Sequence, residues 1–269
     1  MRLSHRFVLA TLFASSTLLV PSIALAAEPG AEQPKNDNPS AGLKGFELML
    51  RPSFGGAPSD SPVRFAPTNG VKLASDPGAL MQGASPWGYG FVGQASVGYR
   101  FVPFLSAGLR GGFRSASGSN LNDGSTSLSR SGWDAGAYVR FYPAVFSESV
   151  SKYLDPWVSA GVSYQRDTQS FKKGIATSNG GNVQADWSLE HHAVSIPLGI
   201  GVDYRVAKFL SVGPSFEAAI NNPIAGCMSA SAPGFAGPTY CSNSEPGKNF
   251  VKADTYIAWN AGLDAKVTF

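Results

Sequence analysis

The sequence alternates between apolar and polar side chains, and its last thirteen residues show the pattern most clearly. Every odd position from Ile257 to Phe269 is apolar, whereas no even position carries a large apolar side chain. A β-strand places alternate side chains on opposite faces. The segment therefore predicts a strand with one apolar face and one polar face.

Seven further segments show the same period of two and are separated by turn-forming residues. Together with the last segment they predict strands at 44–54, 88–102, 104–115, 132–142, 156–167, 189–206, 209–221 and 257–269. Single-chain bacterial membrane barrels have an even number of strands, each spanning about 9–11 residues. We therefore predict an all-β fold over residues 43–269: an eight-stranded antiparallel up-and-down transmembrane β-barrel, closed by pairing of the last strand with the first.

The connections between the predicted strands alternate in length. Strands join closely around Pro103 and around Ala207 and Lys208, and we expect a short helical turn between Pro143 and Asp155. The other four connections are long and polar: 55–87, 116–131, 168–188 and 222–254. Short turns on one rim and long loops on the other are typical of an outer-membrane barrel whose long loops lie outside the cell.

Two prolines conflict with this scheme. Pro197 and Pro214 lie inside predicted strands, and proline is normally confined to sheet edges or bulges because it lacks a backbone N–H. We expect a local bulge or a register shift at each of them.

The N-terminus predicts export. Arg2 and Arg6 precede an apolar run at 7–20, and Ala24-Leu25-Ala26 forms a cleavage site, so residues 1–26 predict a cleaved secretory signal peptide. An uncleaved anchor helix is the alternative, and Pro21 disfavours it. Residues 27–42 show no periodicity and predict a disordered leader.

Cleavage would leave a nearly neutral chain. It removes two of the 21 basic residues and none of the 18 acidic ones, leaving a net charge of +1. This balance gives no support for nucleic-acid binding. The mature chain also lacks the apolar run of about 20 residues that a transmembrane helix needs. It is therefore expected to be either a soluble β protein or a membrane β-barrel.

The composition of the polar face favours the membrane barrel over a soluble barrel such as a lipocalin. Glycine, serine and charged residues are too small and too polar to fill a dry core, and aromatic residues gather near the predicted strand ends, as in interfacial girdles. The predicted lumen collects charges of both signs: Glu47, Arg51, Arg100, Arg110, Arg114, Asp134, Arg140, Asp167, Asp203, Arg205, Glu217, Asp264 and Lys266.

These charges have two interpretations. The interior of an eight-stranded barrel is only wide enough for side chains, so paired charges that plug the lumen are expected. The alternative is a narrow, porin-like channel lined by arginines. Lumen glycines leave room for long side chains to cross the axis, or for water.

Candidate chemistry is sparse. His191 and Ser195 share the lumen face but lie about 13 Å apart along a strand, too far for direct contact. His192 faces lipid or the rim. We therefore expect no enzymatic activity and no cofactor, and a lipid A-modifying enzyme ranks third among the function classes.

Two cysteines, Cys227 and Cys241, lie in one stretch rich in glycine, proline and serine. In an exported protein they predict a disulfide that closes a short loop. No histidine or further cysteine lies nearby in the sequence, so we expect no metal site there.

The eight segments, the signal sequence, the 194–205 strand and the closing 261–269 strand resemble the small outer-membrane β-barrel family of OmpA/OmpX type. The resemblance implies a monomer in the lipid of a Gram-negative outer membrane. It also implies that the barrel-assembly machinery recognises the last strand, through Gly262, Leu263, Val267 and Phe269.

The same barrel serves several functions, so the resemblance does not fix one. We expect a role in envelope structure or in surface recognition and adhesion, with an extracellular ligand bound by the outer loops.

Overall fold

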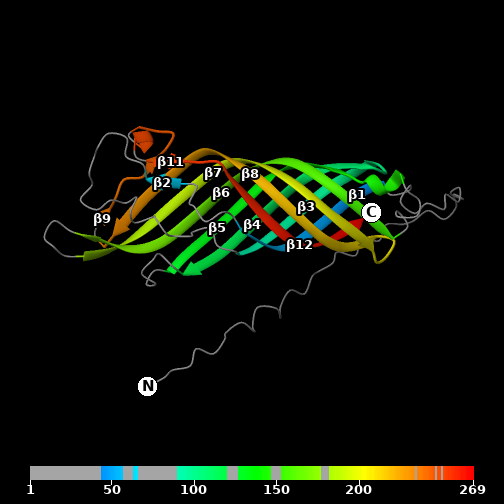
Figure 1. Ribbon diagram of the computed structural model, residues 1–269, viewed down its shortest axis with the longest axis horizontal. Coiled ribbons are helices and arrows are strands. Elements are labelled where there is room, and N and C mark those ends of the chain that lie inside the picture. The colour runs from blue at the N-terminus through cyan, green and yellow to red at the C-terminus, as the bar shows by residue number, and fades with distance from the viewer. Residues whose placement is uncertain are drawn as a thin grey trace, which may run out of the picture. The chain divides into compact units, whose positions relative to one another are not determined.

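The computed structural model describes residues 44–56, 63–65, 90–119, 127–146, 153–176, 182–233, 235–245, 247–249 and 251–269 (Figure 1). The expected signal peptide at 1–26 and leader at 27–42 lie outside these residues.

Eight long antiparallel strands form a closed ring. They are β1 (Gly45–Gly56), β3 (Gly90–Val102), β4 (Leu105–Ser119), β5 (Ser127–Phe141), β6 (Leu154–Ala176), β7 (Asn182–Arg205), β8 (Leu210–Ala232) and β12 (Tyr256–Thr268). Each strand pairs with the next, and β12 pairs with both β8 and β1. Because the ring closes, the backbone hydrogen bonds are satisfied between neighbouring strands. The predicted eight-stranded up-and-down barrel is confirmed (Figure 1).

The barrel has apolar side chains outside and charged side chains inside. Leu109 and Leu263 are 64% and 63% exposed, whereas Arg100 and Asp264 are 0% and 1% exposed. An apolar outer surface is unfavourable in water and favourable in the hydrocarbon of a membrane, so this arrangement is that of a membrane barrel. On β12 the odd positions face outward and the even positions inward, as the alternation predicts.

Aromatic rings mark both borders of the apolar surface. At the end of the barrel that holds the C-terminus, Tyr99 packs on Phe46 and Phe101 with ring centroids 5.1 and 5.2 Å apart. At the other end, Trp133 packs on Tyr164 at 5.5 Å. These rings are placed as interfacial girdles. We call the end that holds the C-terminus the inner end and the opposite end the outer end.

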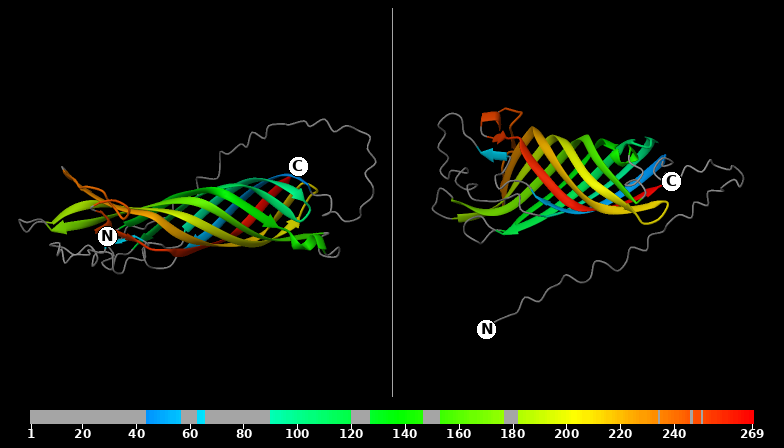
Figure 2. Two further views of the ribbon diagram at one scale, coloured as in Figure 1. Left: turned by 90° about the horizontal axis from the view of Figure 1, so that it is seen from above. Right: turned by 45° about the vertical axis from the view of Figure 1, so that its right-hand side comes forward.

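Three strands are much longer than the sequence predicts. β6 continues to Ala176, β7 begins at Asn182 and β8 continues to Ala232, so most of the predicted loop 168–188 and part of 222–254 are strand. Figure 2 shows these strands extending past the rest of the barrel at the outer end. The outward positions there, such as Thr168 and Lys172, are polar. These segments therefore lack the apolar alternation from which the strands were predicted.

The prediction of bulges at two prolines is wrong. Pro197 lies opposite Ala219, and Pro214 opposite Leu263, in unshifted register. The β7–β8 register shifts instead where Ala193 pairs with Pro223, leaving Ile224 as the extra residue. A missing N–H interrupts a ladder only locally, so proline need not shift the register.

Short elements complete the structure. The 3₁₀ helix η1 (Pro143–Phe146) confirms the predicted helical turn. At the outer end β9 (Phe235–Ala236) and β10 (Tyr240–Cys241) pair with β8, and β11 (Val251–Ala253) pairs with β2 (Val63–Phe65) near η2 (Gly247–Asn249). No helix within the described ranges is long and apolar enough to cross a membrane.

The predicted disulfide is present. Cys227 of β8 lies opposite Cys241 of β10, and their sulfurs are bonded across 14 positions of sequence. The bond ties the segment that follows β8 back onto the extended part of that strand.

Gly45 offers a test of barrel closure. Its φ of 144° is rarely adopted by other residues, and a Cβ there would lie 1.8 Å from the Phe269 carbonyl oxygen. We expect Gly45→Ala to destabilise the folded barrel by about 1–3 kcal/mol, measured by urea unfolding in lipid vesicles. Gly111→Ala is the matched control, because its Cβ would meet only the Asp134 carbonyl oxygen at 3.7 Å. Equal stability of the two variants would contradict this account of closure.

Candidate functional site

The lumen is filled by two layers of charged side chains, and the inner layer lies towards the inner end. Lys266 Nζ lies 2.5 Å from Asp203, and Arg100 Nη1 lies 2.8 Å from Asp155. Glu47 is 4.0 Å from both cations. All five side chains are at most 6% exposed. Pairing of this kind makes buried charge tolerable in a low-dielectric interior.

Two aromatic side chains complete the inner layer. The Arg100 guanidinium lies 3.7 Å from the Tyr142 ring centroid, and Arg140 lies 4.1 Å from that of Trp157. Tyr142 donates a hydrogen bond to Glu47, whereas Trp157 Nε1 donates one to Asp203 at 3.1 Å. Stacked cations and rings therefore occupy the space that the ion pairs leave.

The outer layer lies above the inner layer and centres on Glu217. Arg110 donates two hydrogen bonds to the Glu217 carboxylate, at 2.6 and 2.8 Å, and Arg51 donates a third at 3.2 Å. Arg51 also binds Asp264 through two nitrogens, at 2.5 and 2.9 Å. Gln94 donates to Glu217 at 3.2 Å. Bidentate arginine–carboxylate pairs are among the strongest contacts in proteins.

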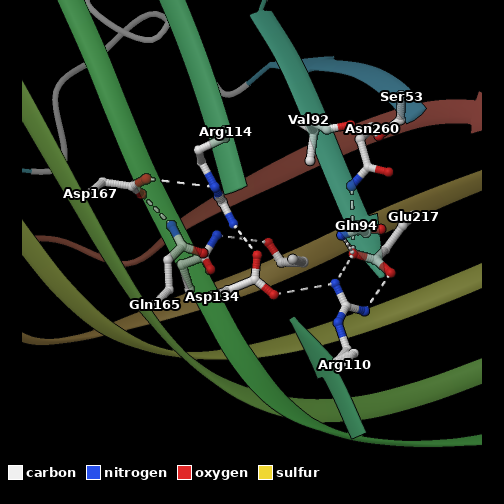
Figure 3. Close-up of polar contacts among 12 residues, drawn as sticks. Ser53, Val92, Gln94, Arg110, Arg114, Asp134, Gln165, Asp167, Glu217 and Asn260 are labelled. Atoms are coloured by element: carbon white, nitrogen blue, oxygen red, sulfur yellow. Dashed lines mark hydrogen bonds and ion pairs between the residues drawn. The ribbon is translucent and has the colours of Figure 1, made fainter. Parts of the chain in front are cut away.

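The same layer continues towards the outer end. Arg114 lies 3.0 Å from Asp134 and 3.6 Å from Asp167, and Arg130 lies 3.0 Å from Asp167. Gln165 also donates to Asp167, as Figure 3 shows. Carboxylates and arginines therefore alternate across the lumen, and Glu217 and Asp167 each bridge arginines from two different strands.

Two glycines make room for this network. A Cβ at Gly132 would lie 1.9 Å from Asp167 Oδ1, and a Cβ at Gly201 would lie 2.4 Å from the Trp157 ring. The space beside these lumen glycines is thus occupied by neighbouring side chains rather than by a gap.

Cavities interrupt the packing of the described lumen residues, and two of them share part of their lining. One, at the outer end, has an empty volume of about 570 Å³ including the solvent at its mouth, and the second, deeper one has about 300 Å³. Both are lined by Gln94, Arg110 and Glu217. The Arg110–Glu217 pair therefore borders both cavities.

The residues predicted for the lumen take different places in it. Arg205 ends β7 and is partly exposed. The rest belong to the two layers: Glu47, Arg51, Arg100, Arg110, Arg114, Asp134, Arg140, Asp167, Asp203, Glu217, Asp264 and Lys266.

Sequence reasoning missed Arg130 and Tyr256, which belong to the outer layer. Arg130 lies in a predicted loop, although it continues the even-numbered inward series of β5 that includes Asp134. Tyr256 precedes the predicted last strand, and its hydroxyl donates to Asp167 at 3.2 Å. Following the alternation one or two residues past the apolar stripe would have found both.

The histidines occupy different faces. His191 is buried against Tyr256 with ring centroids 5.2 Å apart, and His192 faces outward, where its Nδ1 lies 2.5 Å from the Tyr164 hydroxyl. Ser195 is also buried in the lumen. Within the described part of the chain, no group of three or more His, Cys, Asp or Glu residues could hold a metal ion.

The proposed assembly residues lie on β12 and at its end. Leu263 and Phe269 face outward, and Phe269 is 72% exposed while its backbone N–H donates to the Phe46 carbonyl. Val267 shares the outward parity, and Gly262 lies on the inward face. Their recognition by assembly machinery stays a prediction.

No protein-family model and no curated protein matches the sequence. Among solved structures, the fold is similar to Neisserial surface protein A at 15% identity and a TM-score of 0.41, over 85% of this chain and 99% of that one. It is similar to a major outer membrane protein from Thermus thermophilus at 11% and 0.48, over 82% and 98%. It is similar to the outer membrane protein OprG from Pseudomonas aeruginosa at 13% and 0.44, over 85% and 99%.

These TM-scores are below 0.5, so the fold rests on the structure's own strand order, apolar exterior and charged lumen. The chain has the fold of the small eight-stranded outer-membrane β-barrels. A closed barrel with this lipid-facing belt is a protein of the bacterial outer membrane.

Glu217 is the best test of the outer layer. Glu217→Gln keeps the shape but removes the carboxylate that binds both Arg51 and Arg110: Arg51 keeps Asp264, whereas the nearest carboxylate left to Arg110, on Asp134, is 3.7 Å away. We expect a loss of about 3–5 kcal/mol in the free energy of unfolding in vesicles, because an uncompensated buried charge is costly.

Glu190→Gln is the matched control, since Glu190 pairs with Arg166 on the exposed outer face, where such pairs contribute about 1 kcal/mol or less. Equal losses in the two variants would contradict the pairing account.

Proposed function

We propose that this protein is a non-conducting outer-membrane barrel whose outer end takes part in recognition at the cell surface. The closed inner layer of the lumen is the observation that carries the proposal.

The inner layer leaves little room for ions. Arg100 and Tyr142 are 0% exposed, and Trp157 and Lys266 are 1% and 2% exposed. An eight-stranded barrel has an interior just wide enough for side chains, so these groups fill its cross-section. Opening a path would require separating buried ion pairs, which is costly.

The outer end is built as a rigid scaffold. Above the Trp133–Tyr164 girdle, β6, β7 and β8 remain paired, and their inward side chains form an apolar cluster: Phe171, Leu189 and Met228 are at most 6% exposed. The disulfide adds a covalent tie. Recognition sites are commonly carried on such supported surface segments.

A narrow channel is the second candidate, and the two cavities that border the Arg110–Glu217 pair favour it. Conduction would need this pair to separate and the inner layer to open as well. The second requirement makes the closed barrel the better-supported function.

Single-channel recording in a planar bilayer tests the proposal. We expect no discrete steps from the wild-type protein. Trp157→Ala removes the buried indole of the inner layer and should introduce discrete, salt-dependent steps. Trp133→Ala, which removes an outward-facing indole, should leave the barrel silent.

Steps from the wild-type barrel would contradict the proposal and favour the channel. Identical behaviour of the two tryptophan variants would show that Trp157 does not close the lumen.

A further inference from the structure

Hydroxyl side chains lie side by side on the outside of the barrel, above the aromatic girdle of the outer end. Ser129 of β5 lies opposite Ser170 of β6. Ser170 lies opposite Ser188 of β7, and Ser188 lies opposite Ser229 of β8. Neighbouring strands are about 4.8 Å apart, so these four residues form one continuous row across four strands. We call them the serine row.

The serine row faces away from the lumen. Its neighbours along β6 and β7, Phe171 and Leu189, are buried on the inward face, at 6% and 3% exposed. Ser129 and Ser170 are exposed, and the other two serines are partly exposed. The hydroxyl groups are therefore open to the surroundings of the outer end.

A second row of hydroxyl groups lies one step closer to the girdle. Ser115 of β4 lies opposite Ser131 of β5, and Ser131 lies opposite Thr168 of β6. Ser115 and Ser131 are exposed, and Thr168 is partly exposed. Each hydroxyl group can donate one hydrogen bond and accept two. The two rows together give the outward face from β4 to β8 a surface of uncharged donors and acceptors.

The charged side chains beside the two rows are paired. Arg166 Nη2 lies 3.0 Å from a carboxylate oxygen of Glu190, and Lys172 Nζ lies 3.5 Å from one of Asp186. Anionic headgroups are attracted by an excess of cations. Among the described outward residues around the rows, each arginine and lysine has a carboxylate beside it. The face therefore favours a neutral partner that forms hydrogen bonds.

The two rows lie at the depth of lipid headgroups. Trp133 marks the interface on β5, and Ser131 and Ser129 lie two and four positions further out on the same strand. With a rise of about 3.3 Å per residue and a tilt of about 40°, the rows lie roughly 5 and 10 Å above the girdle. The headgroup region on each side of a bilayer is about 5–8 Å thick. Headgroups of the surrounding leaflet are therefore within reach of these hydroxyl groups.

We infer that the two hydroxyl rows bind the uncharged sugar headgroups of glycolipids in the leaflet around the outer end. A sugar hydroxyl both donates and accepts, so adjacent hydroxyls of one headgroup can bond to neighbouring serines. The acyl chains of the same lipid would lie on the apolar outward face below the girdle, where Val162 is 53% exposed. The inference goes beyond the proposed function and does not depend on it, because it concerns the outside of the barrel and not the lumen.

Lipid retention tests the inference. The full barrel is reconstituted in vesicles that contain equal amounts of three lipids with the same acyl chains: digalactosyl diacylglycerol, phosphatidylglycerol and phosphatidylcholine. It is then extracted in mild detergent, and the lipids that it retains are counted by native mass spectrometry. We expect the barrel to retain at least threefold more of the digalactosyl lipid than of either phospholipid.

Two variants of the serine row show whether its hydroxyl groups are responsible. One combines Ser129→Ala, Ser170→Ala, Ser188→Ala and Ser229→Ala, which removes the hydroxyl groups and keeps the side chains small. It should retain the three lipids equally. The matched variant carries threonine at the same four positions, which keeps the hydroxyl groups and suits a strand, so it should retain the preference. Circular dichroism verifies that both variants are folded.

Equal retention of the three lipids by the wild-type barrel would overturn the inference. A preference for phosphatidylglycerol would overturn the class of partner, because it would show that the face selects negative charge. A sugar preference that persists in the alanine variant, or that is lost in the threonine variant, would show that the hydroxyl groups are not the binding groups. None of these outcomes bears on conductance, which tests the proposed function separately.

Discussion

Charge neutralisation inside a narrow lumen is the constraint on which the rest of this structure depends. An arginine removed from water needs a compensating partner, a carboxylate in most cases here and the Trp157 ring for Arg140, and a lumen eight strands wide is little wider than the side chains that fill it. Glu217, Asp264 and Asp167 each hold arginines against the barrel wall. Glycines opposite them, such as Gly132, exist because no larger residue fits. The closed lumen follows from the same pairing.

The alternation of the strands is continuous, but the surroundings of each face change along the barrel. Between the girdles, the outward face is apolar and the lumen is charged. Above the outer girdle the order reverses: Lys172 is exposed on the outside, while Phe171 and Leu189 are buried inside. The extended part of β6, β7 and β8 is thus built like a water-soluble protein on top of a membrane barrel. This reversal supports an ordered outer end rather than a set of loops.

The same reversal explains what the sequence could and could not predict. Apolar alternation located all eight strands, because lipid imposes a strong pattern over their membrane-spanning parts. It fails above the girdle, where polar residues take the outward positions: Thr168 and Lys172 on β6, and Ser129 and Ser131 beside Arg130 on β5. Arg51 and Asp264 are neighbours across the seam between β1 and β12, yet they are 213 positions apart in the sequence, so their pairing depends on the closed register, which no local pattern encodes. The position of the bulge was missed for a similar reason: Pro223 lay in a predicted loop, whereas Pro197 and Pro214 only interrupt the ladder.

The central claim is that water reaches the lumen from the outer end and stops at the inner layer. The most direct measurement is the reaction of single introduced cysteines with a small, charged methanethiosulfonate reagent in vesicles, followed by mass spectrometry. Ala116→Cys lines the outer cavity at a partly exposed position, and Ser106→Cys lies in β4 near the inner end at a position that is 0% exposed. The account predicts that Ala116→Cys reacts when the reagent is on the outer side and not when it is on the inner side, and that Ser106→Cys stays unmodified from either side. Comparable reaction rates at the two positions would contradict it.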